Sequence, residues 1–248
     1  MNQLNDQKSI HFLENKAEFN EFFEQYIHRD WIVSLNADAE EIKKFIVAHK
    51  YVIVKPIDAM EGHGIYKLNR DNIADIDAEC AKLSKQNFII EEILQQHHSM
   101  VLGNKSVNTI RVHTLIDKTG KAQILSCVLR AGVGDSVVDN YCSGGVIYPL
   151  NAEYGIVDGS GVSRAGSGHI KHPQTEIIMI GFKVPNWEVL TTELKKAAEK
   201  IPEIRLIGWD VAITENGIAL IEGNHNPDYE LYEFIGKGKS FKQIKDLI

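Results

Sequence analysis

The sequence predicts an α+β protein, built from β-hairpins and amphipathic helices. Two stretches, 106–131 and 207–222, each hold two β-prone runs separated by a glycine-containing turn, which is typical of a hairpin. Three other stretches, 13–28, 38–50 and 185–201, carry apolar residues at helical spacing. Because hairpins join antiparallel strands, we expect antiparallel sheets with helices packed on them.

Composition narrows the class of protein. The chain has 248 residues and a formal net charge of −7. That length fits one large or two small domains, and the acidic balance argues against nucleic acid as the main partner. The N-terminal stretch holds no apolar core of the signal-peptide kind, and no run approaches the ~20 apolar residues of a membrane span. Three scattered cysteines, Cys80, Cys127 and Cys142, indicate reduced thiols. We therefore expect a cytoplasmic protein without a membrane span.

The first helix is expected over Leu13–His28, after a polar lead-in at 1–12. Its apolar stripe is formed by residues at i, i+3, i+4, i+7 and i+8, namely Phe19, Phe22, Phe23, Tyr26 and Ile27. Lys16 lies near the start of this helix, where the helix dipole favours anions rather than cations. From its position alone, Lys16 reads as a solvated surface lysine.

A glycine loop follows the first buried strand. After a short strand at 31–33 and the helix at 38–50, Tyr51–Ile57 is apolar except for Lys55, and the loop 58–65 reads DAMEGHGI before the chain returns at 66–68. Backbone N–H groups of such a loop can cradle phosphate while Lys55 neutralises it. The alternative is a tight turn that needs glycine, with Lys55 snorkelling at the strand end.

Two acids end the next strand. A helix is expected at 75–85 and a strand at 87–94, in which Glu91 and Glu92 are adjacent. One of them must point toward the interior, where an unpaired carboxylate is costly. Its partner is expected to be a ribose hydroxyl or a lysine, unless the strand simply leaves the core there.

The hairpin at 106–131 places arginine in apolar strands. Arg111 and Arg130 are suited to bidentate contacts with phosphate or carboxylate, and a structural ion pair with Asp or Glu fits equally well. The chain then passes Asn140 and two glycines into another strand ending near residue 150. Residues 151–175 are rich in glycine and serine and predict a functional loop or substrate lid. Its histidines, His169 and His172, fit a surface loop better than a zinc site.

The last hairpin carries the strongest signal. A three-residue turn at 215–217, closing on Gly217 with positive φ, places Asp210 opposite Glu222. On the other face it pairs Val211 with Ile221 and Ile213 with Ala219. Asn224 shares the face of Glu222, and its partner Gly208 is expected to leave open space.

Facing carboxylates repel each other across a strand pair, and a divalent cation between them reverses that effect. Two carboxylates and an amide are all-oxygen ligands, which suit Mg²⁺ with its remaining sites open to phosphate. We therefore interpret Asp210, Glu222 and Asn224 as a clamp for Mg²⁺ and nucleotide, the alternative being a solvated acidic hairpin face. Before it, Asn186 is the expected N-cap of the helix at 185–201, and 239–248 reads as a short terminal helix.

The order of these motifs resembles the ATP-grasp superfamily over nearly the whole chain. The matching stretches are ENKAEF at 14–19, VIVKP at 52–56 with EGHGI at 61–65, FIIEEIL at 88–94, and GWDVAI at 208–213 with IEGN at 221–224. Within the superfamily the chain is most similar to the sugar-transfer-associated group, on SVNTIRVHTL at 106–115, HP at 172–173 and the whole of 208–224.

The resemblance implies an ATP-grasp fold, in which two α+β subdomains with antiparallel sheets, here 13–93 and 94–248, grip the nucleotide between them. Lysines and the glycine loop would contact the phosphates, and Glu91 or Glu92 with the backbone around Ile93 would hold adenine and ribose. The implied nucleotide-binding residues are Lys16, Lys55, Gly62, His63, Gly64, Glu91, Glu92, Ile93 and Asn140. The implied Mg²⁺ ligands are Asp210, Glu222 and Asn224, and the implied catalytic residues, contacting phosphate or acyl phosphate, are Arg111 and Arg130.

The resemblance also implies ATP- and Mg²⁺-dependent joining of a carboxylate to an amine through an acyl phosphate, with release of ADP and phosphate. The small-molecule acceptor is expected to be an amino sugar or amino acid in surface polysaccharide assembly. A kinase with a hydroxyl acceptor, or a non-catalytic nucleotide-binding partner of a glycosyltransferase, are the alternatives.

Two departures from the family pattern stand out. Gly208 occupies a position where many of these ligases carry arginine, for which Arg111 or Arg130 could substitute. Most members also carry a domain before the lysine helix, where this sequence has residues 1–12. We expect either that a second subunit, as in a homodimer, supplies part of the acceptor site, or that the sequence lacks a preceding domain.

Overall fold

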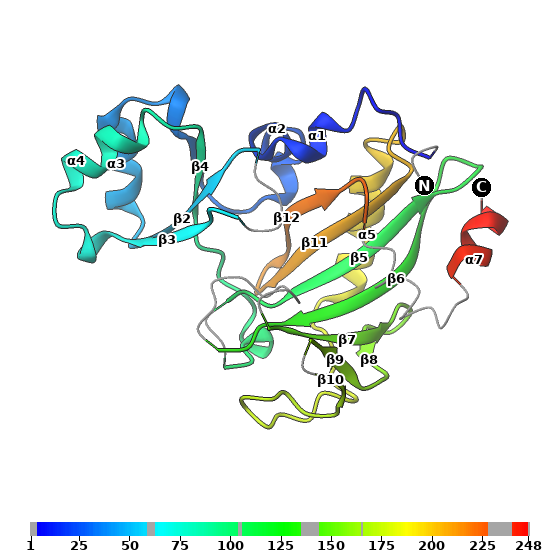
Figure 1. Cartoon of the computed structure of the whole chain (residues 1–248). Coiled ribbons are helices and arrows are strands. Elements are labelled where there is room, and N and C mark those ends of the chain that lie inside the picture. The colour runs from blue at the N-terminus through cyan, green and yellow to red at the C-terminus, as the bar shows by residue number, and fades with distance from the viewer. Residues whose placement is uncertain are drawn as a thin grey trace. The chain divides into compact units, whose positions relative to one another are not determined.

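The computed structural model describes residues 4–58, 63–103, 106–134, 144–164, 166–227 and 240–247 (Figure 1). The chain divides into two compact units, Glu14–Leu94 and Met1–Leu13 with Gln95–Ile248. Each unit combines helices with an antiparallel sheet, as the α+β prediction requires. Among the described helices, none has the length and apolar character needed to cross a membrane. Cys80 and Cys127 are buried free thiols, and Cys142 lies outside the described residues.

The predicted helix at 13–28 is broken into short pieces. They are α1 (His11–Glu14), α2 (Lys16–Phe22) and a 3-10 turn at Glu24–Tyr26. The break occurs because Asn15 caps a new helix: its side chain accepts the N–H groups of Ala17 and Glu18 at 3.0 and 3.2 Å. The apolar stripe survives the break, since Phe19, Phe23, Tyr26 and Ile27 are all buried.

The sheet of the Glu14–Leu94 unit has the order β1-β4-β2-β3, with every neighbouring pair antiparallel. Its strands are β1 (Trp31–Val33), β2 (Tyr51–Pro56), β3 (Tyr66–Asn69) and β4 (Phe88–Glu92). On one face lie α3 (Ala39–Ala48) and α4 (Ile76–Leu83), as Figure 1 shows. Their side chains join those of β2 and β4 in one core, formed by Ile42, Ile46, Val52, Val54, Cys80, Leu83 and Ile90.

The second unit is built on an eight-stranded antiparallel sheet. Its main order is β10-β9-β7-β6-β5-β11-β12, with β8 beside β7. The strands are β5 (Thr109–Ile116), β6 (Ala122–Ala131), β7 (Val146–Asn151), β8 (Ile156–Val157), β9 (Gly161–Ser163), β10 (Gly166–His169), β11 (Leu206–Thr214) and β12 (Gly217–Asn224). The long central strands β5, β6 and β11 form the platform from which the charged side chains described below project.

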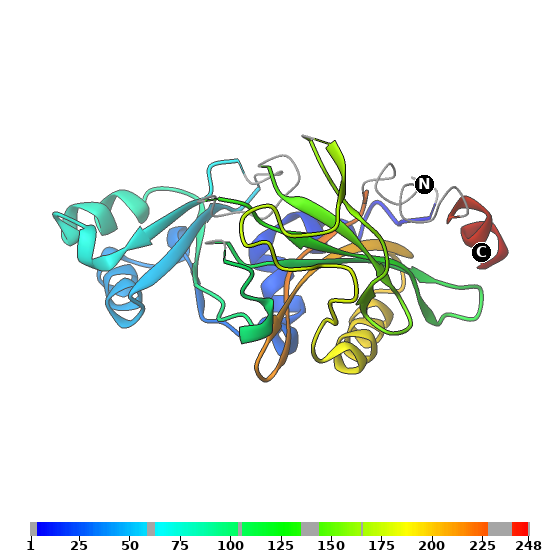
Figure 2. The same ribbon diagram turned by 90° about the horizontal axis from the view of Figure 1, so that it is seen from below.

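Helix α5 (Trp187–Glu199) packs against β5, β6 and β12 on one face of this sheet (Figure 2). It buries the four side chains that its spacing predicts, Leu190, Leu194, Ala197 and Ala198. Asn186 is at the predicted N-cap, but with φ of 54° it donates its side-chain amide to the carbonyl of Thr214 at 3.1 Å. Helix α7 (Ser240–Leu247) adds Ile244 to a separate cluster with Leu115, Leu125 and Leu206.

The polar lead-in is tied to this sheet. The side chain of Asn5 is buried and makes two hydrogen bonds of 2.9 Å to the backbone of Leu206 at the start of β11, one as donor and one as acceptor. The amide nitrogen of Asn5 also donates to the carbonyl of His225 at 2.7 Å, so both donors of the buried amide are used.

The stretch 151–175, predicted as a loop, holds the short strands β8, β9 and β10, and its role as a substrate lid stays a prediction. Gly161 serves packing, because a Cβ there would come within 2.6 Å of the ring of Tyr148. His169 contacts the Ser163 hydroxyl at 2.9 Å, whereas His172 is buried and donates to the carbonyl of Gly132 at 3.0 Å. The two histidines thus serve separate local contacts rather than one metal ion.

Candidate functional site

The β11–β12 hairpin brings the predicted metal ligands together. Asp210 lies opposite Glu222, and Gly208 lies opposite Asn224, as the sequence predicts. The turn differs: Thr214 pairs with Gly217, and a bulge after Asp210 then shifts the register so that Val211 faces Leu220. The predicted pairs of Val211 with Ile221 and of Ile213 with Ala219 are therefore wrong. The bulge restores the register that a three-residue turn would have produced.

Two arginines occupy both oxygens of the buried Asp210 carboxylate. Arg111 donates Nε to Oδ1 at 2.5 Å and Nη2 to Oδ2 at 2.9 Å, and Arg130 donates Nη1 to Oδ2 at 2.7 Å. Strand β5 pairs with β11 so that Arg111 stands opposite Asp210. Burial alone would raise the pKa of Asp210, but the two guanidinium groups hold it well below its usual range. Of the two alternatives for these arginines, the structure shows ion pairs with an acid.

Glu222 is the more open of the two carboxylates. Half of its side chain is exposed, and its Oε1 lies 4.0 Å from Nη2 of Arg111. Partial burial of the carboxyl group and the adjacent charge of Asp210 raise its pKa to about 7. Glu222 is thus held beside a like charge yet remains accessible. An incoming cation would relieve the repulsion between the two carboxylates.

Asn224 completes an all-oxygen donor set. Its Oδ1 accepts the N–H of Asn226 at 2.9 Å, and an amide oxygen has a second lone pair available. Two carboxylates and an amide on neighbouring strand positions fit Mg²⁺, a cation that keeps water or phosphate oxygens in its other sites. The donor chemistry of Asp210, Glu222 and Asn224 therefore fits the metal predicted from the sequence.

The space at Gly208 is filled, contrary to the sequence prediction. A Cβ at this position would lie 2.7 Å from Cβ of Pro227 and 3.1 Å from the ring of His113. A larger side chain cannot enter without moving one of them, so an arginine at this position does not fit the structure. Glycine is required here to let the chain after β12 approach β11.

We expect Gly208→Ala to lower the free energy of unfolding by about 1–3 kcal/mol, because the added methyl overpacks this contact. Urea unfolding of the variant and the parent protein measures the difference. A midpoint equal to that of the parent would show that Pro227 moves aside freely.

In the other unit, Glu91 is the centre of a buried ionic network. The Glu91 side chain is 4% exposed and accepts hydrogen bonds from Arg29 at 2.7 and 3.0 Å and from Asn20 at 2.9 Å. Lys55 forms an ion pair with its other oxygen. The inward acid is therefore Glu91, and a lysine is its partner. Lys55 is 14% exposed, so it does not snorkel into solvent.

Arg29 and Asn20 were missed by sequence reasoning. Asn20 interrupts the apolar stripe beside Phe19, and a polar residue in such a stripe is the signal that could have marked a buried partner. Nothing local to Arg29 indicates its contact with Glu91, 62 residues away in sequence.

Lys16 and the glycine loop meet at the end of β2. Nζ of Lys16 donates to the carbonyl of Ile57 at 3.1 Å, so the lysine is not the solvated surface residue that its position suggests. Gly64 has φ of +73°, and a Cβ there would come within 2.9 Å of the Pro56 ring. His63 is exposed beside it, and Gly62 lies outside the described residues, as does Asn140. The lysine thus lies at the base of the loop.

Glu92 and Ile93 follow at the end of β4. Glu92 is 39% exposed and accepts the N–H of Asp30 at 3.3 Å, with His49 at 3.8 Å. Ile93 is partly buried. Because Glu91 is enclosed by protein partners, Glu92 is the acid of the pair that keeps surface for a ligand.

A family model described as sugar-transfer associated ATP-grasp matches residues 1–246 of the sequence. The chain belongs to this family. The fold agrees: solved ATP-grasp structures superpose on this ATP-grasp chain, which confirms the fold predicted from the sequence.

Three of these structures show the extent of the likeness. The ATP-grasp ligase PsnB, solved with a precursor variant, Mg and ADP, has a TM-score of 0.56 at 13% identity, covering 93% of this chain and 56% of PsnB. N5-carboxyaminoimidazole ribonucleotide synthetase from Thermotoga maritima has a TM-score of 0.56 at 11% identity, and the match covers 97% of this chain and 51% of the synthetase. Biotin carboxylase from Campylobacter jejuni has a TM-score of 0.58 at 10% identity, and the match covers 96% of this chain and 46% of the carboxylase. The chain thus spans about half the length of these proteins. No curated protein matches its sequence.

The Glu91 network makes the stability of this ATP-grasp chain depend on pH. Burial alone would raise the pKa of Glu91, but its ion pairs with Arg29 and Lys55 hold that pKa well below the usual range. The unfolded chain therefore takes up the Glu91 proton first as pH falls through ~4.3. The stabilisation is present above that value and is lost below it.

We expect the stability difference between the parent protein and Glu91→Gln to shrink as the pH is lowered through this window. Urea unfolding of both proteins from about pH 3 to pH 7 measures it. A difference that stays constant with pH would contradict the ionic role of Glu91.

Proposed function

We propose that this chain is an ATP- and Mg²⁺-dependent ligase that joins a carboxylate to an amine through an acyl phosphate, releasing ADP and phosphate. The observation that carries the proposal is the Asp210, Glu222 and Asn224 donor set with Arg111 and Arg130 against it. Family membership supports the proposal, as does PsnB, a ligase of the same fold solved with Mg and ADP.

The residues of the Glu14–Leu94 unit are assigned to the nucleotide. Lys16 and Lys55, with the loop around His63 and Gly64, would bind phosphate. Lys55 is near the end of β2, where the loop begins, and Nζ of Lys16 contacts the carbonyl of Ile57 just beyond it. Glu92 and the backbone of Ile93 would hold ribose and adenine. Glu91 is assigned a positioning role because its oxygens already bind Lys55, Arg29 and Asn20.

The residues of the other unit are assigned to the metal and to the transferred group. Bound Mg²⁺ would neutralise charge on the phosphates as the terminal phosphoryl group moves to the carboxylate. Arg111 and Arg130 already balance the charges of Asp210 and ionised Glu222. When phosphate arrives, either guanidinium can turn from Asp210 to it, because arginine donates in the same bidentate way to both anions.

This charge balance predicts an order of binding. Two positive and two negative side chains leave the site without the net negative charge that a bare cation needs, whereas a Mg²⁺–ATP complex brings its own negative charge. We expect Mg²⁺ alone to leave the melting temperature unchanged and Mg²⁺ with ATP to raise it. A rise with Mg²⁺ alone at millimolar concentration would contradict this order.

The experiment that tests the proposal is ATP turnover with Mg²⁺ over a panel of carboxylates, with and without hydroxylamine. Carboxylate-dependent ADP release with a trapped hydroxamate is expected. ADP release that needs a hydroxyl compound and yields no hydroxamate would favour a kinase instead. ATP binding without turnover over the panel would favour a non-catalytic partner of a glycosyltransferase.

The acceptor class rests on the description of the family. Sugar-transfer association favours an amino sugar or amino acid as the amine, in the assembly of a surface polysaccharide or sugar conjugate. The reduced thiols of Cys80 and Cys127 favour the cytoplasm as the compartment. A homodimer is proposed as the assembly, and size-exclusion chromatography with light scattering tests it.

A further inference from the structure

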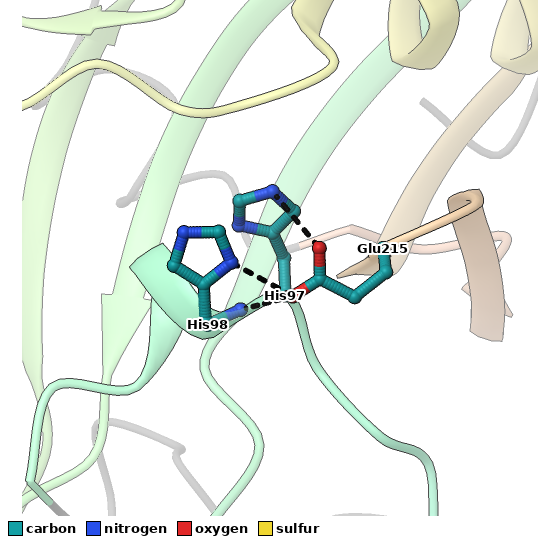
Figure 3. Close-up of side chains that lie close together, drawn as sticks. All are labelled: His97, His98 and Glu215. Atoms are coloured by element: carbon teal, nitrogen blue, oxygen red, sulfur yellow. Dashed lines mark hydrogen bonds and ion pairs between the residues drawn. The ribbon is translucent and has the colours of Figure 1, made fainter.

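Two adjacent histidines face a glutamate at the far end of the β11–β12 hairpin. Figure 3 shows the rings of His97 and His98 beside the carboxylate of Glu215. Nε2 of His97 lies 3.5 Å from Oε2, and Nδ1 of His98 lies 2.9 Å from Oε1. The three ligand atoms lie within 4.8 Å of one another. We propose that His97, His98 and Glu215 bind a divalent transition-metal ion of the zinc class, separate from the nucleotide-associated Mg²⁺.

The donor chemistry favours zinc over magnesium. Two imidazoles and one carboxylate are borderline ligands that suit Zn²⁺, whereas Mg²⁺ prefers oxygen alone. Zinc–ligand bonds of ~2.0–2.1 Å place tetrahedral ligand atoms about 3.3 Å apart. The separations of the Glu215 oxygens from Nδ1 of His98 and Nε2 of His97, 2.9 and 3.5 Å, lie on either side of that value. The side chain of His98 is 77% exposed and that of Glu215 is 55% exposed, so an ion can enter and keep a water ligand.

Backbone contacts fix the two segments before any metal binds. The N–H of His97 donates to the carbonyl of Ile213 at 2.7 Å, and the N–H of His98 donates to Oε1 of Glu215 at 2.8 Å. The rings of the two histidines stack with centroids 4.3 Å apart. Little ordering of the chain therefore remains to be supplied by the metal, which favours binding.

Two hydrogen bonds must change when the metal binds. One joins Nδ1 of His98 to Oε1 of Glu215 at 2.9 Å, and it changes because both side chains become ligands. The other involves His97. Nδ1 of His97 accepts the N–H of Ser99 at 3.1 Å, so in the neutral ring the proton is on Nε2, the atom that faces Glu215. Zn²⁺ takes the place of that proton at Nε2, and since a neutral histidine ligand keeps one ring proton, the proton moves to Nδ1. The amide of Ser99, in the 3-10 helix His98–Met100, then loses its acceptor, so its amide resonance should change when the metal binds.

The site would link the hairpin to the segment by which the chain enters this unit. Gln95 is the first residue of the unit after Leu94, and His97 and His98 follow directly. Glu215 is in the turn of the same hairpin that carries Asp210 and Glu222 toward its other end. A bound ion would hold this connecting segment against the hairpin turn as a structural clasp.

Zinc binding to the chelator-treated full chain tests the proposal, by competition with a chromogenic chelator and by the visible absorption of bound Co²⁺. We expect His98→Ala and Glu215→Gln each to weaken Zn²⁺ binding by about tenfold or more. His11→Ala, at an exposed histidine of α1 in the same unit, is the matched control and should bind as the parent does. Glu215→Gln preserves side-chain shape, so it keeps the test valid if His98→Ala does not fold.

Two further readouts separate the clasp from the Mg²⁺ ligands. Zinc should shift the amide resonance of Ser99 in the parent protein and not in Glu215→Gln. It should likewise raise the melting temperature of the parent protein and leave that of Glu215→Gln unchanged. Asp210→Asn should retain the Ser99 shift. Equal zinc affinity in the parent and Glu215→Gln, or a zinc signal lost in Asp210→Asn but kept in His98→Ala, would overturn the proposal.

Discussion

Glu222→Gln is expected to reduce ATP turnover by at least ~100-fold without lowering the free energy of unfolding. The loss of activity follows from removal of a charged metal ligand. Stability is preserved because Glu222 is half exposed, and because partial burial of its carboxyl group and the like charge of Asp210 together raise its pKa to about 7. Replacing an ionised carboxylate in that setting by a neutral amide relieves repulsion. Initial rates of ADP release and urea unfolding of the same preparation measure the two quantities.

Asp210→Asn is the matched contrast on the opposite strand. It should remove turnover equally, and it should also destabilise the fold by about 3–5 kcal/mol, because Arg111 and Arg130 lose the buried carboxylate that they share. The two variants thus separate metal binding from charge compensation. Glu222→Gln with near-parent turnover would refute the assignment of Glu222 as a ligand. Equal stability loss in both variants would refute the asymmetry between the two acids.

The facing of Asp210 and Glu222 could be predicted from the sequence, although the turn could not. A three-residue turn and a two-residue turn followed by one extra residue in β12 both shift the pairing by one, so both bring these carboxylates together. The sequence does not distinguish them, because Leu220 and Ile221 are both apolar and either can face the core. The facing of the two carboxylates can therefore be predicted without knowing the type of the hairpin turn.

The partners of the charged residues could not be predicted, because they depend on which strands become neighbours. Arg111 meets Asp210 across 99 residues of sequence, since β5 pairs with β11. Arg29 meets Glu91 across 62 residues. Periodicity along one strand indicates on which side of the sheet a side chain lies. It does not indicate which residue of a neighbouring strand the side chain contacts. Sequence reasoning therefore left phosphate and ion pair as equal alternatives for Arg111; the fold shows the ion pair with Asp210, and the phosphate contact stays a prediction.

Glu91→Gln is expected to lower the stability of the Glu14–Leu94 unit by about 3–5 kcal/mol, since Arg29 and Lys55 lose the buried carboxylate between them. Hydrogen exchange of the amides of β2 and β4 measures this locally. Lys55→Met removes one cation and leaves the bond between Arg29 and Glu91 in place, so its stability loss should be smaller. A parent-like exchange pattern in Glu91→Gln would show that the network adds nothing to stability.

ATP binding should rank these two variants in the opposite order. In the ligand-free protein Lys55 is bound to Glu91, so phosphate must compete with a carboxylate for its ammonium group. Arg29 stays bound to Glu91 when Lys55 turns away, which keeps that carboxylate compensated. Glu91→Gln removes the competitor and should leave ATP affinity unchanged or increased at a temperature where the variant is folded. Lys55→Met removes a charged donor and should weaken it about 10–100-fold. Calorimetric titration of both variants with ATP decides whether Glu91 holds the nucleotide itself or positions the lysine that does.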